Sequence, residues 1–419
     1  MQKTPTVAQK WRWRIPIILG VTFFINYLDR NNLALALPQI ANDFGWNNKE
    51  LANNGQFLLA AFFLTYGLSN MLLSPLAERL GAKRSAIGAV MAFSICTLLS
   101  APLGQWLAAL IGLRLLLGIG EGVHVPMLGA ITSRWFAPHE RSRANAIWNV
   151  GILVATALGP LFLVPLISAF GWRVSFAALG IAGLLISVPL LWLFVDDRPT
   201  VDQGGEHVLA FRAESIDADV SSMNTKKQGN YTRSRQFWLL VVGGIFNAFC
   251  GFGILNWLPT YFTRARGLNF SQLGWPLALV FTSGILSVLL MAVLGDKINR
   301  RARLASAGLF ASGILVFFAS HSSSLGLLVF FFSAAVFCQS AYTGQEHALV
   351  QRLVSTEHVG AGTGLYNGLS VLIGGVGGSL VPGTIVALTG DFNAGLLSII
   401  GGALLGSVIL GLLAHAINY

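Results

Sequence analysis

The sequence predicts a membrane protein built from α-helices. Its 419 residues are 54% hydrophobic and only 11% charged, whereas a soluble domain carries about 25% charged residues. Apolar runs of about 20 residues, the length that crosses a bilayer as a helix, recur along the whole chain. The alternating apolar and polar positions that spanning strands need do not appear, so we expect an all-α membrane protein rather than a barrel.

Twelve such runs can be counted, and they divide into two sets of six. A polar stretch of mixed charge at 196–236 separates the sets, and its Pro and Gly residues are typical of a linker. We therefore predict an N-terminal six-helix bundle over 1–195, a cytoplasmic linker over 196–236 and a C-terminal six-helix bundle over 237–419. The expected spans are 12–35, 51–76, 84–103, 105–133, 143–168, 172–195, 237–263, 273–295, 303–320, 324–350, 358–389 and 391–417.

Basic residues are distributed unevenly between the two faces of the predicted bundles. Most of the 27 Lys and Arg residues lie in the N-terminal tail, the linker and the links that follow even-numbered helices. The opposite links hold only Lys49, Arg173, Arg264 and Arg266. Because cytoplasmic loops carry an excess of Lys and Arg, both termini are expected in the cytoplasm. The net charge of +10 is then a consequence of topology, and no nucleic acid partner is needed to explain it.

Two charges lie inside the fourth predicted span, in the segment RLLLGIGEGVHVP at 114–126. Arg114, Gly118 and Glu121 share one helical face, with the charges about 10 Å apart. Ionisable groups in spanning helices face a protein interior or a water-filled cavity and mark an ion or substrate path. His124, one turn beyond Glu121, could bond that carboxylate or relay a proton, or it could simply pack between helices.

The first predicted span carries a polar cluster within two turns, comprising Asn26, Tyr27, Asp29, Arg30 and Asn31. Neighbouring side chains on a helix point about 100° apart, so Arg30 can meet an anion while Asp29 faces another helix. The guanidinium group suits a carboxylate because it forms paired, charge-assisted hydrogen bonds. The alternative is that the cluster marks a helix end at the lipid headgroups.

The links after the second and eighth spans echo each other. They read SPLAERLGAKR at 74–84 and VLGDKINRRAR at 293–303, and each places an acid shortly before basic residues at a cytoplasmic helix end. Such an acid can pair with a base or cap a helix and so latch one conformation. Glu78, Arg79 and Asp296 are the predicted latch residues, and the alternative is that these links only set topology.

The chain resembles the major facilitator superfamily, and in particular its anion:cation symporter family. That family includes bacterial sugar-acid transporters and the relatives of sialin and the vesicular glutamate transporters. In the link at 74–84, Ser74 and Glu78 replace the glycine and aspartate usual in the superfamily signature. The segments that carry the resemblance are NYLDRNNLALALPQI at 26–40, SPLAERLGAKR at 74–84, RLLLGIGEGVHVP at 114–126 and SRWFAPHERSRANAI at 133–147.

The resemblance implies the major facilitator fold, in which two six-helix bundles rock about a central site. Arg30 matches the family's arginine for the substrate carboxylate, and Asp29 and Glu121 match its proton-coupling carboxylates. Desolvation favours the neutral form of a carboxylate, which agrees with a proton-carrying role. We expect Arg114 to stabilise ionised Glu121 in one state and release it in the other. A static buried ion pair is the alternative.

Further cavity residues are expected on several helices. The tenth span places three polar residues close together, Gln345, Glu346 and His347. They could bind substrate or couple protons, or they could lie at the cytoplasmic mouth without either role. The other candidates combine rings with amides and suit a hydroxylated or aromatic acid, although packing or interface anchoring would also explain the rings. They are Tyr27, Tyr66, Trp148, Asn149, Asn247, Asn256, Trp257, Tyr366 and Asn367.

No catalytic, ATPase or metal-ligand motif appears in the sequence, so we expect a transporter driven by a gradient and not an enzyme. The glycine run at 374–378 lies inside a span, where it favours close helix crossing or bending. The leading hypothesis is a monomeric, proton-coupled symporter that imports a small organic anion across a bacterial cytoplasmic membrane, with the proton as coupling ion and no cofactor. Alternatives are a proton-coupled exporter of drugs or metabolites and, less simply, a membrane-bound sensor or enzyme.

Overall fold

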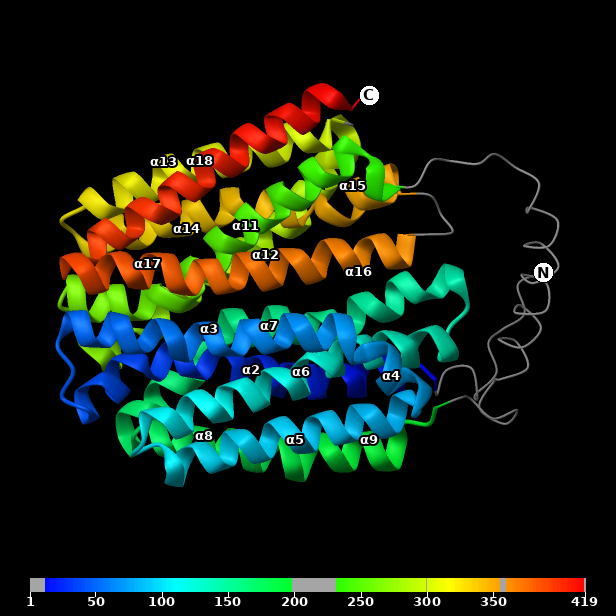
Figure 1. The fold of residues 1–419 in the computed structure, drawn as a ribbon, viewed down its shortest axis with the longest axis horizontal. Coiled ribbons are helices and arrows are strands. Elements are labelled where there is room, and N and C mark those ends of the chain that lie inside the picture. The colour runs from blue at the N-terminus through cyan, green and yellow to red at the C-terminus, as the bar shows by residue number, and fades with distance from the viewer. Residues whose placement is uncertain (1–11, 198–230, 299, 355–358, 418–419) are drawn as a thin grey trace.

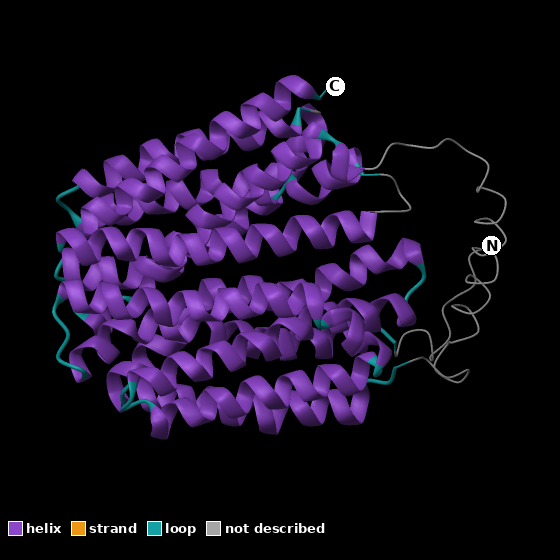
Figure 2. Cartoon of the chain, viewed as in Figure 1, coloured by secondary structure: helices purple, strands orange, loops and turns teal. Residues whose placement is uncertain are grey.

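Helices make up nearly all of the chain in a computed structural model that describes residues 12–197, 231–298, 300–354 and 359–417 (Figures 1 and 2). The described residues contain no strand. The N-terminal half comprises α2 (Arg14–Asp43), α3 (Asn48–Leu72), α4 (Ser74–Arg79), α5 (Ala82–Leu103), α6 (Leu107–Trp135), α7 (Pro138–Phe170), α8 (Trp172–Ala182), η1 (Gly183–Ser187) and α9 (Val188–Phe194). The C-terminal half comprises η3 (Tyr231–Arg233), α11 (Arg235–Thr260), η4 (Tyr261–Ala265), η5 (Phe270–Gln272), α12 (Gly274–Ile298), α13 (Arg301–His321), α14 (Leu325–Thr343), α15 (Glu346–Leu353), α16 (Val359–Leu369), η6 (Ser370–Gly375), α17 (Val376–Thr389) and α18 (Phe392–Ala416).

Eleven helices among the described residues are long and apolar enough to cross a membrane. The remaining helix, α2, corresponds to the first predicted span and falls short because the polar residues near its middle lower its hydropathy. With 30 residues it is about 45 Å long, and most of its side chains are buried against other helices. Protein therefore surrounds its polar cluster. The predicted end of this helix at residue 35 is wrong, because the apolar run continues and the helix ends at Asp43.

The two halves form two helical bundles that lie side by side (Figure 1). α3 packs against α17, α7 packs against α12 and α2 packs against α11, so three helix pairs contribute to the seam. Most of the predicted linker, 198–230, lies outside the described residues. Asp196 and Asp197 at its start bond to the N-terminal half, where Asp196 O accepts from Trp135 Nε1 at 2.7 Å and Asp197 Oδ1 accepts from Lys83 N at 2.8 Å.

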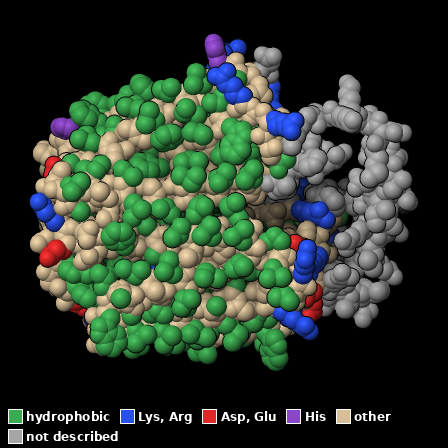
Figure 3. All heavy atoms as spheres, in the orientation of Figure 1, with side chains coloured by type: hydrophobic (Ala, Val, Ile, Leu, Met, Phe, Trp, Pro, Cys, Tyr) green, Lys and Arg blue, Asp and Glu red, His purple; other side chains and the backbone are tan. Residues whose placement is uncertain are grey.

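Basic side chains gather at one end of the bundles, on the right of Figure 3. We call this the basic end, and the other the opposite end. The surface between the two halves is hollowed beside these residues (Figure 3). The basic end carries the described residues Arg79, Lys83, Arg84, Arg134, Arg235, Lys297, Arg300, Arg301, Arg303 and Arg352. This grouping has the asymmetry that the sequence predicts between cytoplasmic and external faces.

The apolar cores show which end of the molecule is closed. One buried cluster takes residues from both halves, such as Leu37 and Ile40 of α2 with Trp257 and Leu258 of α11, and it occupies the opposite end. Toward the basic end the core divides into a cluster in the N-terminal half and another in the C-terminal half. The described residues therefore seal the two bundles together at the opposite end, while their cores are separate at the basic end.

Polar contacts reinforce the closed end. Arg264 Nη2 donates to Asn42 Oδ1 at 2.6 Å, and Thr384 Oγ1 donates to Gln56 Oε1 at 2.7 Å. Each bond joins a residue of one bundle to a residue of the other. A hydrogen bond to a charged group contributes about 1.5–3 kcal/mol, so these contacts supplement the apolar seal without replacing it.

Three spanning helices contain a wide π turn, at η1, η4 and η6. The turn in η6 includes part of the glycine run, whose residues lie close to neighbouring helices. A Cβ on Gly374 would stand 2.5 Å from Ile245 O, and one on Gly375 would stand 2.6 Å from a ring atom of Phe63. The expectation of a close helix crossing at this run is therefore confirmed.

Hydrogen bonds hold α6 firmly against α3. Thr65 Oγ1 donates to Leu115 O at 2.7 Å, and Ser69 Oγ donates to Ile119 O at 2.7 Å. Such side-chain bonds, together with small residues, are what bring spanning helices together when water is absent. Gly118 lies between the two bonds, and a Cβ there would stand 2.2 Å from Thr65 Oγ1. This contact fixes the height at which α6 presents Glu121.

We predict that Gly118→Val destabilises the protein, because the added side chain must push α6 away from α3. Overpacking of this kind costs about 1–3 kcal/mol. Gly112→Val on the same helix is the matched control, since nothing lies within 4 Å of a Cβ at Gly112. Thermal unfolding in detergent should show a lowered melting temperature for Gly118→Val only. Equal melting temperatures for the two variants would contradict the packing argument.

Candidate functional site

Arg30 lies at the centre of a buried polar cluster between α2 and α6. Its Nε is 3.6 Å from Glu121 Oε2, and its Nη1 donates to the hydroxyl of Tyr27 at 2.9 Å. The side chains of Arg30 and Glu121 are 5% and 1% exposed. Because a charge inside a membrane protein is costly unless it is paired, this ion pair accounts for how both residues are tolerated there.

Four aromatic rings surround the Arg30 guanidinium. The ring centres of Tyr27, Phe62, Phe63 and Tyr66 lie 4.3 to 5.8 Å from its Cζ atom. A guanidinium within about 6 Å of a ring face is attracted by the ring electrons. The rings therefore hold Arg30 in place from one side while α6 supplies the opposite charge. They also leave an apolar wall beside a cation, which suits an organic anion.

Asp29 points away from Arg30, as the helical spacing predicts. The hydroxyl of Thr97 on α5 donates to Asp29 Oδ2. Arg114 lies over the ring of Phe176, with its Cζ 5.3 Å from the ring centre, and its charge interacts with those of Asp29 and Glu121. Arg30 rather than Arg114 forms the ion pair with Glu121, because α2 brings Arg30 closer to it.

Several buried polar atoms of this cluster have no hydrogen-bond partner among the described residues. They include Nη2 of Arg30, Nη2 of Arg114, Oδ1 of Asp29 and both carboxylate oxygens of Glu121. Buried polar atoms are normally satisfied, so these atoms are available to bind a ligand or a proton. With all four groups ionised, the two acids and two bases carry no net charge.

His124 is fully buried between aromatic rings. Its ring lies edge-on to Phe23 and Phe93, with centroid distances of 6.2 and 5.7 Å. Neither ring nitrogen has a hydrogen-bond partner among the described residues. It therefore makes no bond to Glu121 here, and the packing alternative describes this geometry.

The side-chain N–H groups of Trp148 and Asn149 donate hydrogen bonds within their own helix, α7. Trp148 Nε1 donates to Asn145 Oδ1 at 3.0 Å, and Asn149 Nδ2 donates to Asn145 O at 2.8 Å. Trp148 also packs edge-on against Phe23, 5.1 Å away. Binding a substrate through these groups would require the bonds to exchange, so their predicted role stays a prediction.

The amide candidates on α11 bond to neighbouring helices. Asn256 Nδ2 donates to Ser379 Oγ at 3.0 Å and Trp257 Nε1 donates to Ser379 O at 3.1 Å, both across to α17. Asn247 Oδ1 accepts from Gln339 Nε2 at 2.7 Å. These bonds connect helices within the C-terminal bundle. Asn367 on α16 is exposed.

The three candidates of the tenth span separate at a break between α14 and α15. Gln345 is fully buried, donates to Met291 O and accepts from Arg301 Nη1 at 2.7 Å, which makes it a packing residue. His347 is 66% exposed and lies 3.8 Å from Glu346.

Glu346 joins a chain of hydroxyl groups that runs into the bundle. Its Oε2 accepts from the Tyr366 hydroxyl at 2.9 Å, and that hydroxyl lies 2.7 Å from the Tyr342 hydroxyl. The tyrosines are buried, so the chain links the mouth at the basic end to the bundle interior.

The predicted latch residues lie at the basic end. Glu78 Oε1 is 3.5 Å from Arg134 Nη2, so this pair connects α4 to the end of α6 within one bundle. Gly81, in the same link, has φ +104°, a conformation that favours glycine. Arg79 is exposed. Asp296 is near the end of α12, but its side chain lies outside the part of the chain that the structure describes.

Sequence reasoning did not single out several residues of the site. Phe62 and Phe63 lie in an apolar run, where aromatic residues suggest ordinary packing, and Thr97 is an isolated hydroxyl in the third span. A useful signal was the four-residue spacing of Phe62 and Tyr66, which places both rings on one helical face. Which cation they would surround depends on helix packing, so the sequence could not identify it.

Two bundles of apolar helices with a buried, charged site between α2 and α6 are features of a membrane transporter. The chain belongs to the Major Facilitator Superfamily, whose sequence profile matches residues 19–379 and 240–418. The predicted major facilitator fold is therefore confirmed.

Known relatives agree with this assignment. The chain is 25% identical over 414 residues to the "Probable galactarate/D-glucarate transporter GudP" of Bacillus subtilis, covering 92% of this chain and 88% of that protein. It is 29% identical over 411 residues to the "Probable sulfoacetate transporter SauU" of Cupriavidus necator, covering 93% and 91%. A crystal structure of a bacterial homolog of the human lysosomal transporter Spinster, inward-facing and occupied, has a similar fold, with a TM-score of 0.75, 19% identity and coverage of 97% and 96%.

We predict that Arg30→Gln destabilises the protein more than the double variant Arg30→Gln with Glu121→Gln. The single change leaves a buried carboxylate without its partner, and breaking a buried ion pair in this way costs about 3–5 kcal/mol. The double change removes both charges together. Melting temperatures of both variants in detergent, measured between acidic and neutral pH, test this.

The penalty of the single variant should shrink at acidic pH, because a protonated Glu121 needs no partner. The ion-pair argument would be contradicted if the double variant melted at a lower temperature than the single one. It would also be contradicted if the loss of melting temperature in the single variant did not change with pH.

Proposed function

We propose that the protein is a proton-coupled symporter that imports a small organic anion. The observation that carries this proposal is Arg30, a buried arginine that retains an unpartnered donor group beside aromatic rings. A substrate carboxylate can accept from that guanidinium. The names of the relatives, which mention galactarate, D-glucarate and sulfoacetate, support an anion with a small carbon skeleton, such as a sugar acid.

Charge balance supports the coupling between anion and proton. The four ionised groups Asp29, Arg30, Arg114 and Glu121 sum to zero, so an anion entering alone would leave one uncompensated negative charge in a poorly hydrated site. Uncompensated buried charge is strongly unfavourable. A proton on Glu121 or Asp29 removes that excess, so each anion charge is best accompanied by one proton. A dianion would then call for both carboxylates.

Glu121 is the stronger candidate for the first proton. Its ion pair with Arg30 competes directly with a substrate carboxylate for the same guanidinium. Protonation of Glu121 weakens the ion pair and frees Arg30 for the substrate. Release of the proton on the other side restores the pair and displaces the anion. Asp29, bonded to Thr97, would carry a second proton, and Arg114 would bias the charge of both acids.

The described conformation corresponds to one state of the proposed cycle. The bundles are sealed at the opposite end and have separate cores at the basic end, so substrate would exchange at the basic end. We place that end in the cytoplasm of a bacterial cell, with both termini on the same side and the single chain as the working unit. Import would begin when the seal at the opposite end opens.

We predict that liposomes containing the protein accumulate one class of organic anion when the outside is made acidic. The probes are a sugar acid, an aromatic acid and a dicarboxylate, each radiolabelled. Accumulation should collapse when a protonophore dissipates the gradient. No accumulation, together with acid-driven loss of preloaded solute, would contradict symport and identify an exporter.

We also predict that Glu121→Gln abolishes gradient-driven accumulation while exchange of labelled for unlabelled substrate continues. Glutamine keeps the shape of the side chain but cannot exchange a proton. Glu50→Gln is the matched control, because Glu50 belongs to a capping box at the start of α3 in which glutamine also fits. Concentrative uptake by Glu121→Gln at wild-type rate would overturn the coupling role.

A further inference from the structure

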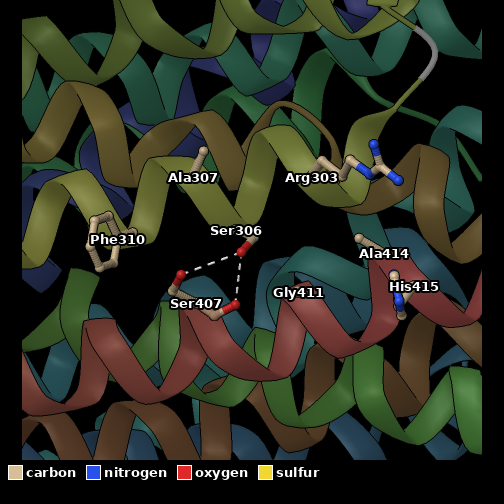
Figure 4. Close-up of a pocket in the computed structure, with 8 residues that line it drawn as sticks. All are labelled: Arg303, Ser306, Ala307, Phe310, Ser407, Gly411, Ala414 and His415. Carbon is tan, nitrogen blue, oxygen red and sulfur yellow. Dashed lines mark hydrogen bonds between the residues drawn. The ribbon is translucent and has the colours of Figure 1, made fainter.

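A cavity of about 450 Å³ lies between α13 and α18, away from the charged site (Figure 4). Its volume is within the range of about 300–1,000 Å³ that small-molecule sites occupy. Residues spaced by one helical turn line it from both sides. They are Arg303, Ser306, Ala307 and Phe310 on α13, with Ser407, Gly411, Ala414 and His415 on α18.

The cavity is polar at one end and apolar at the other. Arg303 and His415 stand at the basic end, and Phe310 lies two turns deeper in α13 (Figure 4). Ser306 Oγ donates to Ser407 O at 2.8 Å, which ties the two helices together. Ala307 has a small side chain and Gly411 has none, so the space beside this bond stays open. A Cβ on Gly411 would be 3.5 Å from Ser306 Oγ.

The cavity opens toward the surface that faces lipid. Phe310, Val408 and Leu412, on the flanks of the same two helices, are about half exposed, at 52%, 60% and 48%. Both helices are long and apolar enough to cross a membrane. A ligand can therefore enter sideways from the bilayer, with its apolar part beside Phe310 and its polar part at the level of Arg303.

We propose that this cavity binds an anionic phospholipid of the leaflet at the basic end. The phosphate would lie between Arg303 and His415, and one acyl chain would follow the groove past Ala307 and Gly411. The charge of the site selects the ligand, since basic pockets between spanning helices bind anionic headgroups. A zwitterionic lipid would gain the apolar contacts but less of the electrostatic attraction.

Arg303 is the residue of its helix end that is best placed for this role. The neighbouring Arg301 bonds Gln345 in the bundle interior, whereas Arg303 lines the cavity at its polar end (Figure 4). Arg300 is exposed at the start of the same helix and does not line the cavity. Comparing Arg303 with Arg300 therefore distinguishes a specific contact with a lipid headgroup from the general attraction of basic residues for an anionic membrane surface.

The test is titration of the purified full chain with phosphatidylglycerol or phosphatidylcholine of identical acyl chains, read by native mass spectrometry. Wild type should bind phosphatidylglycerol more tightly. Arg303→Gln should weaken that binding about fivefold, the effect expected for one basic residue at a membrane surface. Arg300→Gln, the matched control, should change it less than twofold. Equal effects of the two substitutions, or equal binding of the two lipids, would overturn the proposal.

Two further binding experiments distinguish a lipid from a soluble anion as the ligand. Gly411→Leu fills the groove beside Ser306 and should remove the tight phosphatidylglycerol binding even though both basic residues remain. Soluble glycerol phosphate should not compete at concentrations equal to those of the lipid, because it lacks the acyl chain. Undiminished binding by Gly411→Leu, or effective competition by glycerol phosphate, would show a simple anion site and contradict the lipid assignment.

Discussion

The ion pair between Arg30 and Glu121 is the constraint on which the rest of the molecule depends. Each group would be too costly in the membrane without the other, so α2 and α6 must hold them at one height. The hydrogen bonds and glycine contacts between α3 and α6 set that height, and the four rings around Arg30 restrict its guanidinium. With all four buried groups ionised the arrangement is neutral overall, which is the charge balance behind the proposed entry of an anion together with a proton.

The two bundles contribute unequal chemistry to the molecule. All four charged groups of the buried cluster belong to the N-terminal bundle, whereas α11 and α17 contribute amides, an indole and hydroxyls that bond one another. Asn256 and Trp257 are both held by Ser379. The buried polar groups of the C-terminal bundle are therefore mainly neutral, and its acidic residue Glu346 lies near the mouth, bonded to two buried tyrosines.

Much of the fold follows from the sequence because hydropathy and helical period act locally. Twelve spanning helices and the unequal directions of Asp29 and Arg30 could be predicted in this way, although α2 continues to Asp43, beyond its predicted end. The partner of Glu121 could not, because Arg30 and Arg114 both lie within reach until α2 is packed against α6. The burial of Gln345 also depends on the break between α14 and α15, since a continuous helix would aim that side chain elsewhere.

The π turn at Ser370–Gly375 has a consequence for how this helix can change during evolution. A turn closed by i→i+5 bonds contains one residue more than a regular turn. An extra residue in a regular helix would rotate every later side chain by about 100°. Here the later residues Gly378 and Gly383 still meet Phe249 and Gln56, so the wide turn absorbs the additional length. Relatives in which this helix is regular should align with a one-residue gap in the segment, and their glycines beyond it should keep the same neighbours.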